Sequence, residues 1–511
     1  MASRRNELSA YTFSRRRTVA AFLQPSSGGN EEDAPRALRA VVPSIIVGVL
    51  AVAGAGAYGM IKPSAPVGWQ KANAVIVGKQ STTRYVMLDG MLHPVLNIAS
   101  ARLLLTPGSS VVSVDDSVLD SGKVPHGSLV GIPFAPDSLP TAQDAGTAKV
   151  WAYCEQPSSN AQGGTDQKLF VLDGKDTGAV GGSGQLDAGH AMYVQGPDGT
   201  TYLVDATGTS HQLSAGHQGS ATERIRLATA AFGATVGAPQ PVTADWLATL
   251  HQGDPIILPN ADIAGYGTSS SISLGAGAVH VGDVYQVQTD SGQYLHYVVE
   301  QDGVHPVSDF TNRLLEAVDP NRTVPTVPDM EVAGANTRSV FEGTKNWPTA
   351  LVAQANQGAT GNVACSVYAG TASAAGVPQL RLWTGAGYPV NSTSGTAGVY
   401  VTPGSGLLYR QVSGTSTTSG SVDLLTDTGL RYPIQMNNDS NAGGAAPTPN
   451  PGGSTDGSAD GSGDGTANTD DAQARLGYGS VALNPVPLAW SSLLSSGPNL
   501  NTAAAELPQG S

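Results

Sequence analysis

The 511 residues of this chain include only 13% charged side chains, together with 64 glycines and 33 prolines. This composition is typical of a β-rich, loop-rich exterior protein more than of a helical enzyme. The net charge of −14, with no basic stripe beyond the N-terminal region, argues against nucleic-acid binding.

The N-terminal segment, residues 1–39, is predicted to be cytoplasmic and to contain a helix. On a helical wheel of residues 7–23, the larger apolar side chains fall near one side and an arginine run falls partly opposite. The apolar residues are Leu8, Tyr11, Val19, Phe22 and Leu23, and the basic ones are Arg15, Arg16 and Arg17. Such an amphipathic basic helix would dock on a partner or rest on anionic lipid. The alternative is a charge cluster that only sets the membrane topology.

Residues 40–61 read AVVPSIIVGVLAVAGAGAYGMI and contain no charged side chain. At about 1.5 Å per residue, a helix of this stretch extends about 33 Å, enough to cross a bilayer core of about 30 Å. The preceding residues carry a net charge of +3 and the following ones −17, which predicts a single span with a cytoplasmic N-terminus. About 450 residues would then lie outside the membrane. A cleavable signal is the weaker alternative, because its polar lead is normally shorter than these 39 residues.

Three small residues inside this predicted span, Ala51, Ala55 and Gly59, recur at four-residue spacing. A small-xxx-small face of this kind allows close packing against another membrane helix. Chance spacing in a chain rich in glycine and alanine is an equally good explanation.

The two cysteines, Cys154 and Cys365, both follow the predicted span. An oxidising exterior favours a disulfide between them over two separate thiols. A bond across so long a loop would remove on the order of 5 kcal/mol of unfolded-state entropy.

Beyond the span the chain repeats itself. Residues 85–104 and 297–315 both contain a Tyr, then His-Pro-Val eight residues later with Asp-Gly between, and end in Arg-Leu-Leu. Residues 202–211 give a weaker copy, and residues 422–434 give another with Tyr-Pro in place of His-Pro. Each copy predicts a β-hairpin followed by a short helix.

A second matching element strengthens this pattern. Residues 241–253, PVTADWLATLHQG, and residues 485–497, PVPLAWSSLLSSG, share the spacing of Pro, Trp, Leu and Gly. The predicted fold is therefore α+β and β-rich, with four hairpin-plus-helix repeats around a central disulfide-linked β domain.

This pattern predicts the following domains, given in chain order. They are the cytoplasmic segment 1–39, the transmembrane helix 40–61, repeat 1 at 72–141, a first segment of the central domain at 145–163, repeat 2 at 164–267, repeat 3 at 275–340, a second segment of the central domain at 341–395, and repeat 4 at 396–505. A Gly/Ser/Asp/Pro tract at 437–470 without Lys or Arg is predicted to be a flexible insertion in repeat 4.

The sequence offers no catalytic, cofactor-binding or metal-ligating set. Gly78-Lys79 and Gly174-Lys175 lack both the Ser or Thr and the upstream glycine of a phosphate loop. His93 and His305 share a repeat position before proline, where a turn or packing role is favoured over a ligand role.

Several segments taken together resemble the EccB membrane component of type VII (ESX) secretion systems. They are the opening RRNELSAYTFSRRRTVAAFL, the single span, GIPFAPDSLP at 131–140, the D-G-x-x-H/Y-P repeats and the closing LGYGSVALNPVPLAW. The resemblance covers nearly the whole chain, and the insertion at 437–470 departs from it.

The resemblance implies an actinobacterial source and an elongated exterior domain of four repeats around a disulfide that joins Cys154 and Cys365. It also implies a plasma-membrane location and assembly with an EccC-type FtsK/SpoIIIE ATPase, with EccD and EccE, and with a mycosin protease. The repeats of that family resemble cell-wall-binding modules of phage lysins, which implies a contact with peptidoglycan.

Two classes of function follow from these features. The first is a structural membrane subunit that scaffolds the exterior region of a protein-secretion channel and self-associates through its exterior domain. The second is a weak ATP-hydrolysing enzyme, since some family members carry an ATPase label. The missing phosphate loop weighs against ATP binding and hydrolase activity, and cell-wall binding alone is a third option.

Overall fold

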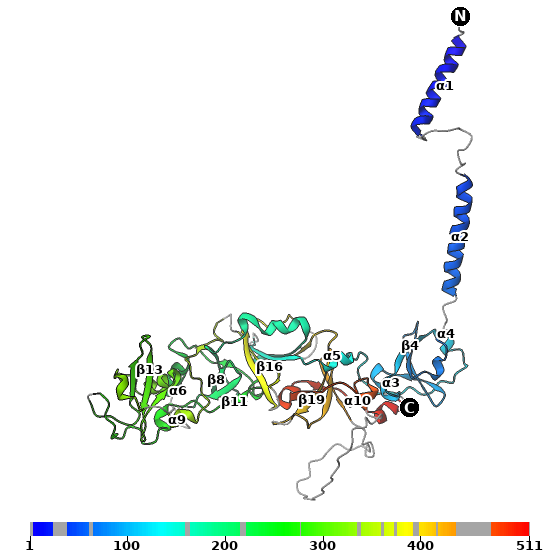
Figure 1. Ribbon diagram of the computed structural model, residues 1–511. Coiled ribbons are helices and arrows are strands. Elements are labelled where there is room, and N and C mark those ends of the chain that lie inside the picture. Colours follow the sequence, from blue (N-terminus) through cyan, green and yellow to red (C-terminus); the bar gives the residue numbers. More distant parts are fainter. Residues whose placement is uncertain are drawn as a thin grey trace. The chain divides into compact units, whose positions relative to one another are not determined.

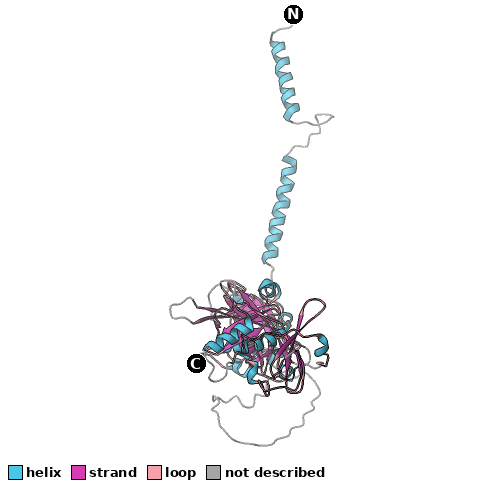
Figure 2. Cartoon of the chain, turned by 90° about the vertical axis from the view of Figure 1, so that its left-hand side faces the viewer, coloured by secondary structure: helices cyan, strands magenta, loops and turns pink. Residues whose placement is uncertain are grey.

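The computed structural model describes residues 4–23, 38–60, 65–158, 164–214, 221–275, 277–334, 339–358, 362–372, 376–391, 398–414, 417–435 and 472–509. The insertion predicted at 437–470 lies outside these residues. The chain divides into two compact units, Met1–Pro66 and Val67–Ser511. Where they are described, the first unit is helical and the second is β-rich, as the colours of Figure 2 show.

The first unit contains helices α1 (Arg4–Leu23) and α2 (Leu38–Met60). All side chains of α1 are exposed. The prediction of a two-faced helix is wrong, because successive helical residues are about 100° apart, which places Arg15 on the same stripe as Tyr11 and Phe22. Its apolar and basic side chains are therefore not separated.

In α2 the side chain of Ala51 is exposed, whereas the side chains of Ala55 and Gly59 lie outside the described residues. Within the portion of the chain that the structure describes, there is no helix of sufficient length and apolar character to traverse a membrane.

The first sheet of the second unit has the order β3-β2-β1-β4, and Figure 1 labels its strand β4. Its strands are β1 (Ala74–Gly78), β2 (Arg84–Leu88), β3 (Met91–Val95) and β4 (Ser110–Val114). The turn between β2 and β3 is Asp89-Gly90, and both residues have the positive φ that a two-residue hairpin turn requires. Helix α3 (Ile98–Leu104) follows and is capped by Asn97, whose side chain accepts a hydrogen bond from the Ser100 amide.

Two further sheets share one topology, in which three antiparallel strands gain a parallel strand on each side. The second sheet has the order β10-β7-β8-β9-β11, and the last has β22-β19-β20-β21-β23. In both, a short helix between the two outer strands buries a tryptophan, Trp246 in one and Trp490 in the other. The two sequence elements that share Pro, Trp, Leu and Gly therefore form the same substructure.

The strands of the second sheet are β7 (His190–Gln195), β8 (Thr201–Asp205), β9 (Thr209–Gln212), β10 (Gln240–Pro241) and β11 (His251–Gln252), with β15 (Ala353–Gln354) paired to β7. Those of the last are β19 (Leu407–Val412), β20 (Val422–Leu425), β21 (Leu430–Ile434), β22 (Asn484–Pro487) and β23 (Ser495–Ser496). The helices between their outer strands are α7 (Ala244–Ala248) and α11 (Leu488–Ser491).

The third sheet is smaller and has the order β12-β13-β14. Its strands are β12 (Val284–Gln288), β13 (Tyr294–Val299) and β14 (Val304–Val307). A parallel bridge between Gln286 and Thr326 adds an outer segment beside β12. Helix α8 (Asp309–Val318) follows β14, and α6 (Ala221–Phe232) of the second sheet packs against it.

The central sheet has the order β17-β16-β5-β6-β18. Its strands are β5 (Val150–Pro157), β6 (Thr165–Leu172), β16 (Val363–Ala372), β17 (Val377–Gly385) and β18 (Val399–Val401). Two predicted boundaries need correction, because β6 and β18 pair within this sheet although the sequence assigned them to repeats 2 and 4. Conversely, β15 lies in the second predicted segment of the central domain but pairs with β7 of the second sheet.

The other described helices are short. They are η1 (Trp69–Lys71), α4 (Asp116–Leu119), α5 (Ala142–Gly146), η2 (Gly174–Val180), η3 (Gly182–Gly184), η4 (Pro259–Ala261), η5 (Asp329–Glu331), α9 (Val340–Gly343), α10 (Ala472–Arg475) and α12 (Thr502–Glu506).

Shared hydrophobic cores join neighbouring sheets. One core combines Trp151 of the central sheet with Trp246 and Trp490 of the second and last sheets. A second core joins the second and third sheets, and a third joins α3 of the first sheet to the last sheet. The first and last sheets are thus held together although most of the chain separates them in sequence.

Candidate functional site

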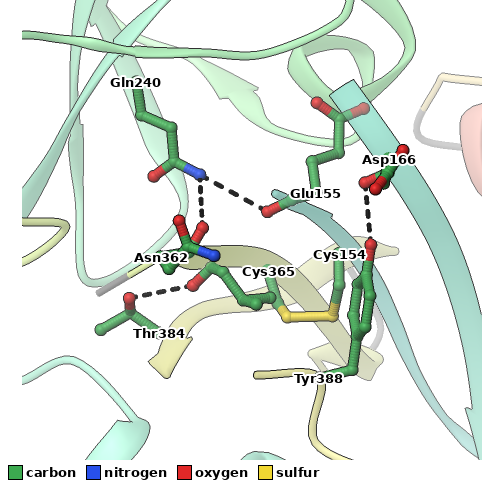
Figure 3. Close-up of a disulfide and its surroundings, with 9 residues drawn as sticks. Cys154, Glu155, Asp166, Gln240, Asn362, Cys365, Thr384 and Tyr388 are labelled. Atoms are coloured by element: carbon green, nitrogen blue, oxygen red, sulfur yellow. Dashed lines mark hydrogen bonds between the residues drawn. A yellow bond between two sulfur atoms is a disulfide. The ribbon is translucent and has the colours of Figure 1, made fainter. Parts of the chain in front are cut away.

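The central disulfide joins two distant segments of the second unit. Cys154 on β5 and Cys365 on β16 are direct register partners with a Cα–Cα distance of 4.0 Å and a sequence separation of 211. Both side chains are fully buried, and Figure 3 shows the bond between them. The bond closes a loop that contains the second and third sheets, so it fixes where the chain leaves and re-enters the central sheet.

Hydrogen bonds surround this bond and connect the central sheet to the second sheet. Gln240 Nε2 donates to the carbonyl of Asn362 at 3.1 Å and to that of Glu155 at 3.5 Å. On the other side, the Tyr388 hydroxyl donates to the carbonyl of Asp166 at 2.9 Å (Figure 3). The disulfide therefore lies within a network that spans both sheets.

The carboxylate of Glu155 links the central sheet to the beginning of α7. It accepts from the Thr243 amide at 2.9 Å and also from the Thr243 hydroxyl, and Thr243 in turn caps α7. Burial raises the pKa of Glu155, and the hydrogen bonds from Thr243 only partly offset this rise.

This raised pKa predicts a pH-dependent stability. The native state holds the Glu155 proton more tightly than the unfolded chain, whose pKa is near the ordinary 4.5. The stability that protonated Glu155 contributes is complete below about pH 4.5 and is lost as the pH rises through the native pKa. The variant Glu155→Gln lacks this ionisation, so the stability of the wild type relative to the variant should fall over that window.

Urea midpoints of both proteins at a series of pH values from about 4 to 8 measure this difference. A wild-type-to-variant difference that stays constant across the series would contradict the assignment.

Lys149 forms a second buried junction. Its ammonium is fully buried and lies 2.8 Å from Asp144 Oδ1 in α5 and 2.7 Å from Asp173 Oδ2 after β6. Asp144 also accepts from the Gly406 amide, and the Asp173 amide donates to the Thr402 hydroxyl. Lys149 thus connects α5, the central sheet and the segment that leads into the last sheet.

The pKa of Asp173 reflects this junction. Burial alone would raise it, but hydrogen bonding and charge attraction from Lys149 overcome that effect and hold the pKa below the ordinary 3.8. At neutral pH, therefore, Asp173 is ionised and the junction is charged. No sequence motif marked Lys149.

The repeat histidines have turn and packing contacts. His93 Nδ1 lies 2.9 Å from the carbonyl of Ser128, and His211 Nδ1 lies 2.9 Å from that of Asp254. His305 Nε2 instead lies 3.0 Å from Asp302 Oδ1.

In the third sheet, Glu300, Asp302 and His305 place potential metal-ligand atoms within 4.8 Å of one another. The sequence did not suggest this cluster, since Asp-Gly looked like a simple turn. Ser339 donates a hydrogen bond to Glu300, and Asp302 pairs with His305. Because each of these groups already has a partner within the protein, a metal is not needed to satisfy them.

Four exposed apolar side chains lie on backbone segments that follow or pair with the first sheet, and we call them the apolar surface. They are Leu96, Leu129, Phe134 and Leu507. Hydrogen bonds hold their backbone segments together: the Leu96 amide donates to the carbonyl of Val130, and the Gln509 amide donates to that of Leu129. This surface joins residues near both ends of the second unit.

Phe134 is the most unusual member of this surface. Its side chain is 90% exposed, and its φ of 63° lies in a region that is strained for any residue with a Cβ atom. A large aromatic side chain that is held out into solvent at a strained position marks a candidate contact site. The sequence placed Phe134 in the GIPFAPDSLP motif but did not indicate its exposure.

Comparison with known families gives one match over the entire chain. The family profile described as "Type VII secretion system ESX-1, transport TM domain B" matches residues 1–511. A relative from Mycobacterium tuberculosis, "ESX-3 secretion system ATPase EccB3", is 27% identical over 494 residues, covering 92% of this chain and 82% of the relative. "ESX-1 secretion system ATPase EccB1" from the same species is 30% identical over 286 residues, covering 55% of this chain and 54% of the relative.

Solved structures show the same fold. The chain is similar to one in "Structure of an intact ESX-5 inner membrane complex, Composite C3 model", with a TM-score of 0.62, 20% identity and coverage of 100% of this chain and 96% of the other. It is also similar to "Structure of EccB3 dimer from the ESX-3 core complex", with a TM-score of 0.61, 24% identity and coverage of 85% and 100%.

Proposed function

The chain belongs to the EccB family of type VII secretion systems, and from this premise we propose how its domains serve the secretion complex. It is a structural subunit of a type VII system, located in the membrane and capable of self-association. The observation that carries this function is the family match over all 511 residues.

We propose a single-pass topology with residues 1–39 in the cytoplasm, residues 40–61 across the membrane and the remainder outside. The charge-free stretch and the positive charge before it support this orientation. Because the basic and apolar side chains of α1 are not separated on two faces, the arginines at 15–17 are better suited to setting topology than to docking an apolar face on lipid. The spacing of Ala51, Ala55 and Gly59 remains a proposal for packing against another membrane helix.

We propose that the exterior region consists of four repeats around the disulfide-linked central sheet. The matching strand order of the second and last sheets supports this count, as do the hairpin-plus-helix units of the first and third. Shared cores make each repeat depend on its neighbours. Such a unit suits the scaffold of a channel, since it can hold distant contact surfaces at fixed separations.

The proposed partners are the other membrane components of the system, namely an EccC-type ATPase, EccD, EccE and a mycosin protease. A second copy of this chain is the proposed partner of the apolar surface around Phe134. The description of one similar structure as a dimer supports self-association in this family.

The variant Phe134→Gly tests the proposed contact, because its effects on folding and on assembly have opposite signs. Glycine relieves the positive-φ strain, so the variant should unfold at an equal or higher temperature than the wild type. Loss of the exposed ring should nevertheless shift the detergent-solubilised full chain toward the monomer in native mass measurements.

Met330→Gly is the matched control, since Met330 is 79% exposed and lies in η5 of the third sheet. It should leave the oligomeric distribution unchanged. If Phe134→Gly has the same oligomeric distribution as the wild type, the apolar surface does not take part in assembly.

ATP hydrolysis is the second candidate function, because the relatives carry the word ATPase in their names. The chain lacks a phosphate loop, which makes hydrolysis by this subunit the weaker proposal. Turnover of Mg²⁺ and ATP by the purified full chain, retained through stringent purification, would favour it. Peptidoglycan binding is a further proposal, for which co-sedimentation of the full chain with cell walls is the direct test.

A further inference from the structure

A groove lies between helices α6 and α8, where the second and third sheets meet. Its volume is about 580 Å³, within the range of small-ligand sites. The two helices pack against each other through buried residues such as Leu227 and Leu314. The groove lies beside this buried contact, on the adjoining side of each helix. The packing of α6 against α8 therefore shapes both the core and the groove.

The sequence explains why this side is hollow. On α6, Arg226 is followed at position i+4 by Ala230, which lies on the same helical stripe, and Gly233 comes directly after the last residue of the helix. On α8, Arg313 is followed at i+4 by Ala317. Each arginine therefore stands beside small residues that leave space for another molecule.

Two arginines give one part of the groove a positive charge. Arg226 and Arg313 both line it, and neither has an ion pair or hydrogen bond with another of the residues that the structure describes. A third arginine, Arg322, is already engaged, since it donates to the Gly282 carbonyl and the Tyr266 hydroxyl. Two guanidinium groups that form no ion pair with a described residue favour an oxyanion, which they can bind through paired N–H groups.

Acidic side chains at the rim of the groove restrict which oxyanions can bind there. Glu316 and Asp319 are exposed and line the same groove. Their negative charges repel a doubly charged phosphate, but they attract an ammonium group that lies next to a carboxylate. Ala230, Ala317 and Val324 add apolar wall between these charges.

We propose that this groove binds a peptide through its carboxylate. Arg226 and Arg313 hold the carboxylate, and Glu316 and Asp319 face the ammonium group of the same ligand. This site is separate from the apolar surface and from the disulfide, so it does not depend on the proposed self-association.

The test uses the full chain in detergent and the dipeptide alanyl-glutamate as the probe, followed by saturation-transfer NMR. Two charge-assisted contacts predict a dissociation constant on the order of 1 mM. The double variant Arg226→Gln/Arg313→Gln should raise that constant more than about tenfold. Lys175→Gln, which removes one exposed charge in η2, should leave it unchanged.

A second variant guards against an indirect effect of losing two arginines. Ala234 is exposed at the edge of the groove, and Ala234→Glu would place a competing carboxylate there. This variant keeps both arginines, and it should weaken binding of the probe as strongly as the double variant does. Inorganic phosphate is a further probe, and the proposal expects it to bind more weakly than alanyl-glutamate.

Three results would overturn the proposal. The first is no saturable binding of alanyl-glutamate up to about 10 mM. The second is equal affinity of the wild type and the double variant. The third is tighter binding of inorganic phosphate than of the dipeptide, which would make the groove a phosphate site.

Discussion

Replacing both cysteines with alanine, in the variant Cys154→Ala/Cys365→Ala, should lower the free energy of unfolding of the central sheet by about 2–5 kcal/mol. The disulfide closes a loop with a sequence separation of 211, so its loss restores much conformational freedom to the unfolded chain. Alanine is chosen because both positions are fully buried and a serine hydroxyl would have no assured partner there.

Hydrogen exchange of the β5 and β16 amides locates this effect. Exchange should accelerate most in these two strands, because they carry Cys154 and Cys365 in direct register. The wild type after reduction should behave like the double variant, which controls for the changed side-chain volume. If both strands keep the same protection from exchange in the variant, the hydrogen bonds between β5 and β16 are sufficient to hold the central sheet together.

The variant Lys149→Met should lower the free energy of unfolding by about 2–4 kcal/mol at neutral pH. It removes a fully buried ammonium and leaves two carboxylates, Asp144 and Asp173, without their shared partner. The expected cost is below that of a completely buried pair because the side chains of the two aspartates are 21% and 23% exposed.

The pH dependence of this cost has a definite sign. The native pKa of Asp173 lies below the ordinary 3.8, so the stability gained from its pairing is present above pH 3.8. That gain is lost as the pH falls through the native pKa. The difference in free energy of unfolding between the wild type and Lys149→Met should therefore become smaller at acidic pH. Denaturant midpoints at about pH 7 and at a series of acidic pH values from about 4 to 2 measure this, with the exposed Lys175→Met as the matched control. A deficit that grows on acidification would contradict the ion-pair account.

Local sequence signals predicted the hairpins well. Asp89-Gly90 lies between alternating strands and forms the expected two-residue turn, because both residues tolerate positive φ. The shared Pro, Trp, Leu and Gly spacing likewise identified two copies of one substructure, since each tryptophan must be buried at the same point.

Strand partners distant in sequence were harder to predict. The outer strands of the second and last sheets pair in parallel, and a parallel pairing leaves no turn signal between its members. The sequence also assigned β6, whose buried residues are Leu169 to Leu172, to the start of a repeat, although β6 pairs antiparallel with β5 in the central sheet.

The candidate sites depend still more on tertiary packing. Arg226 and Arg313 meet only because α6 and α8 pack together, and the small residues that follow each arginine were the only signal. Lys149 lies among apolar residues in KVWAYCE, where sequence alone does not show which acids will approach it. The exposure of Phe134 is a property of backbone conformation and had no sequence signal.

The measurement that tests the central claim most directly is mild-detergent extraction of the tagged full chain, followed by native mass determination and identification of the co-purifying proteins. The account predicts a megadalton-scale assembly that contains an FtsK-type ATPase, in which this chain is a scaffold subunit. A lone monomer or dimer that recurs in several detergents would contradict it.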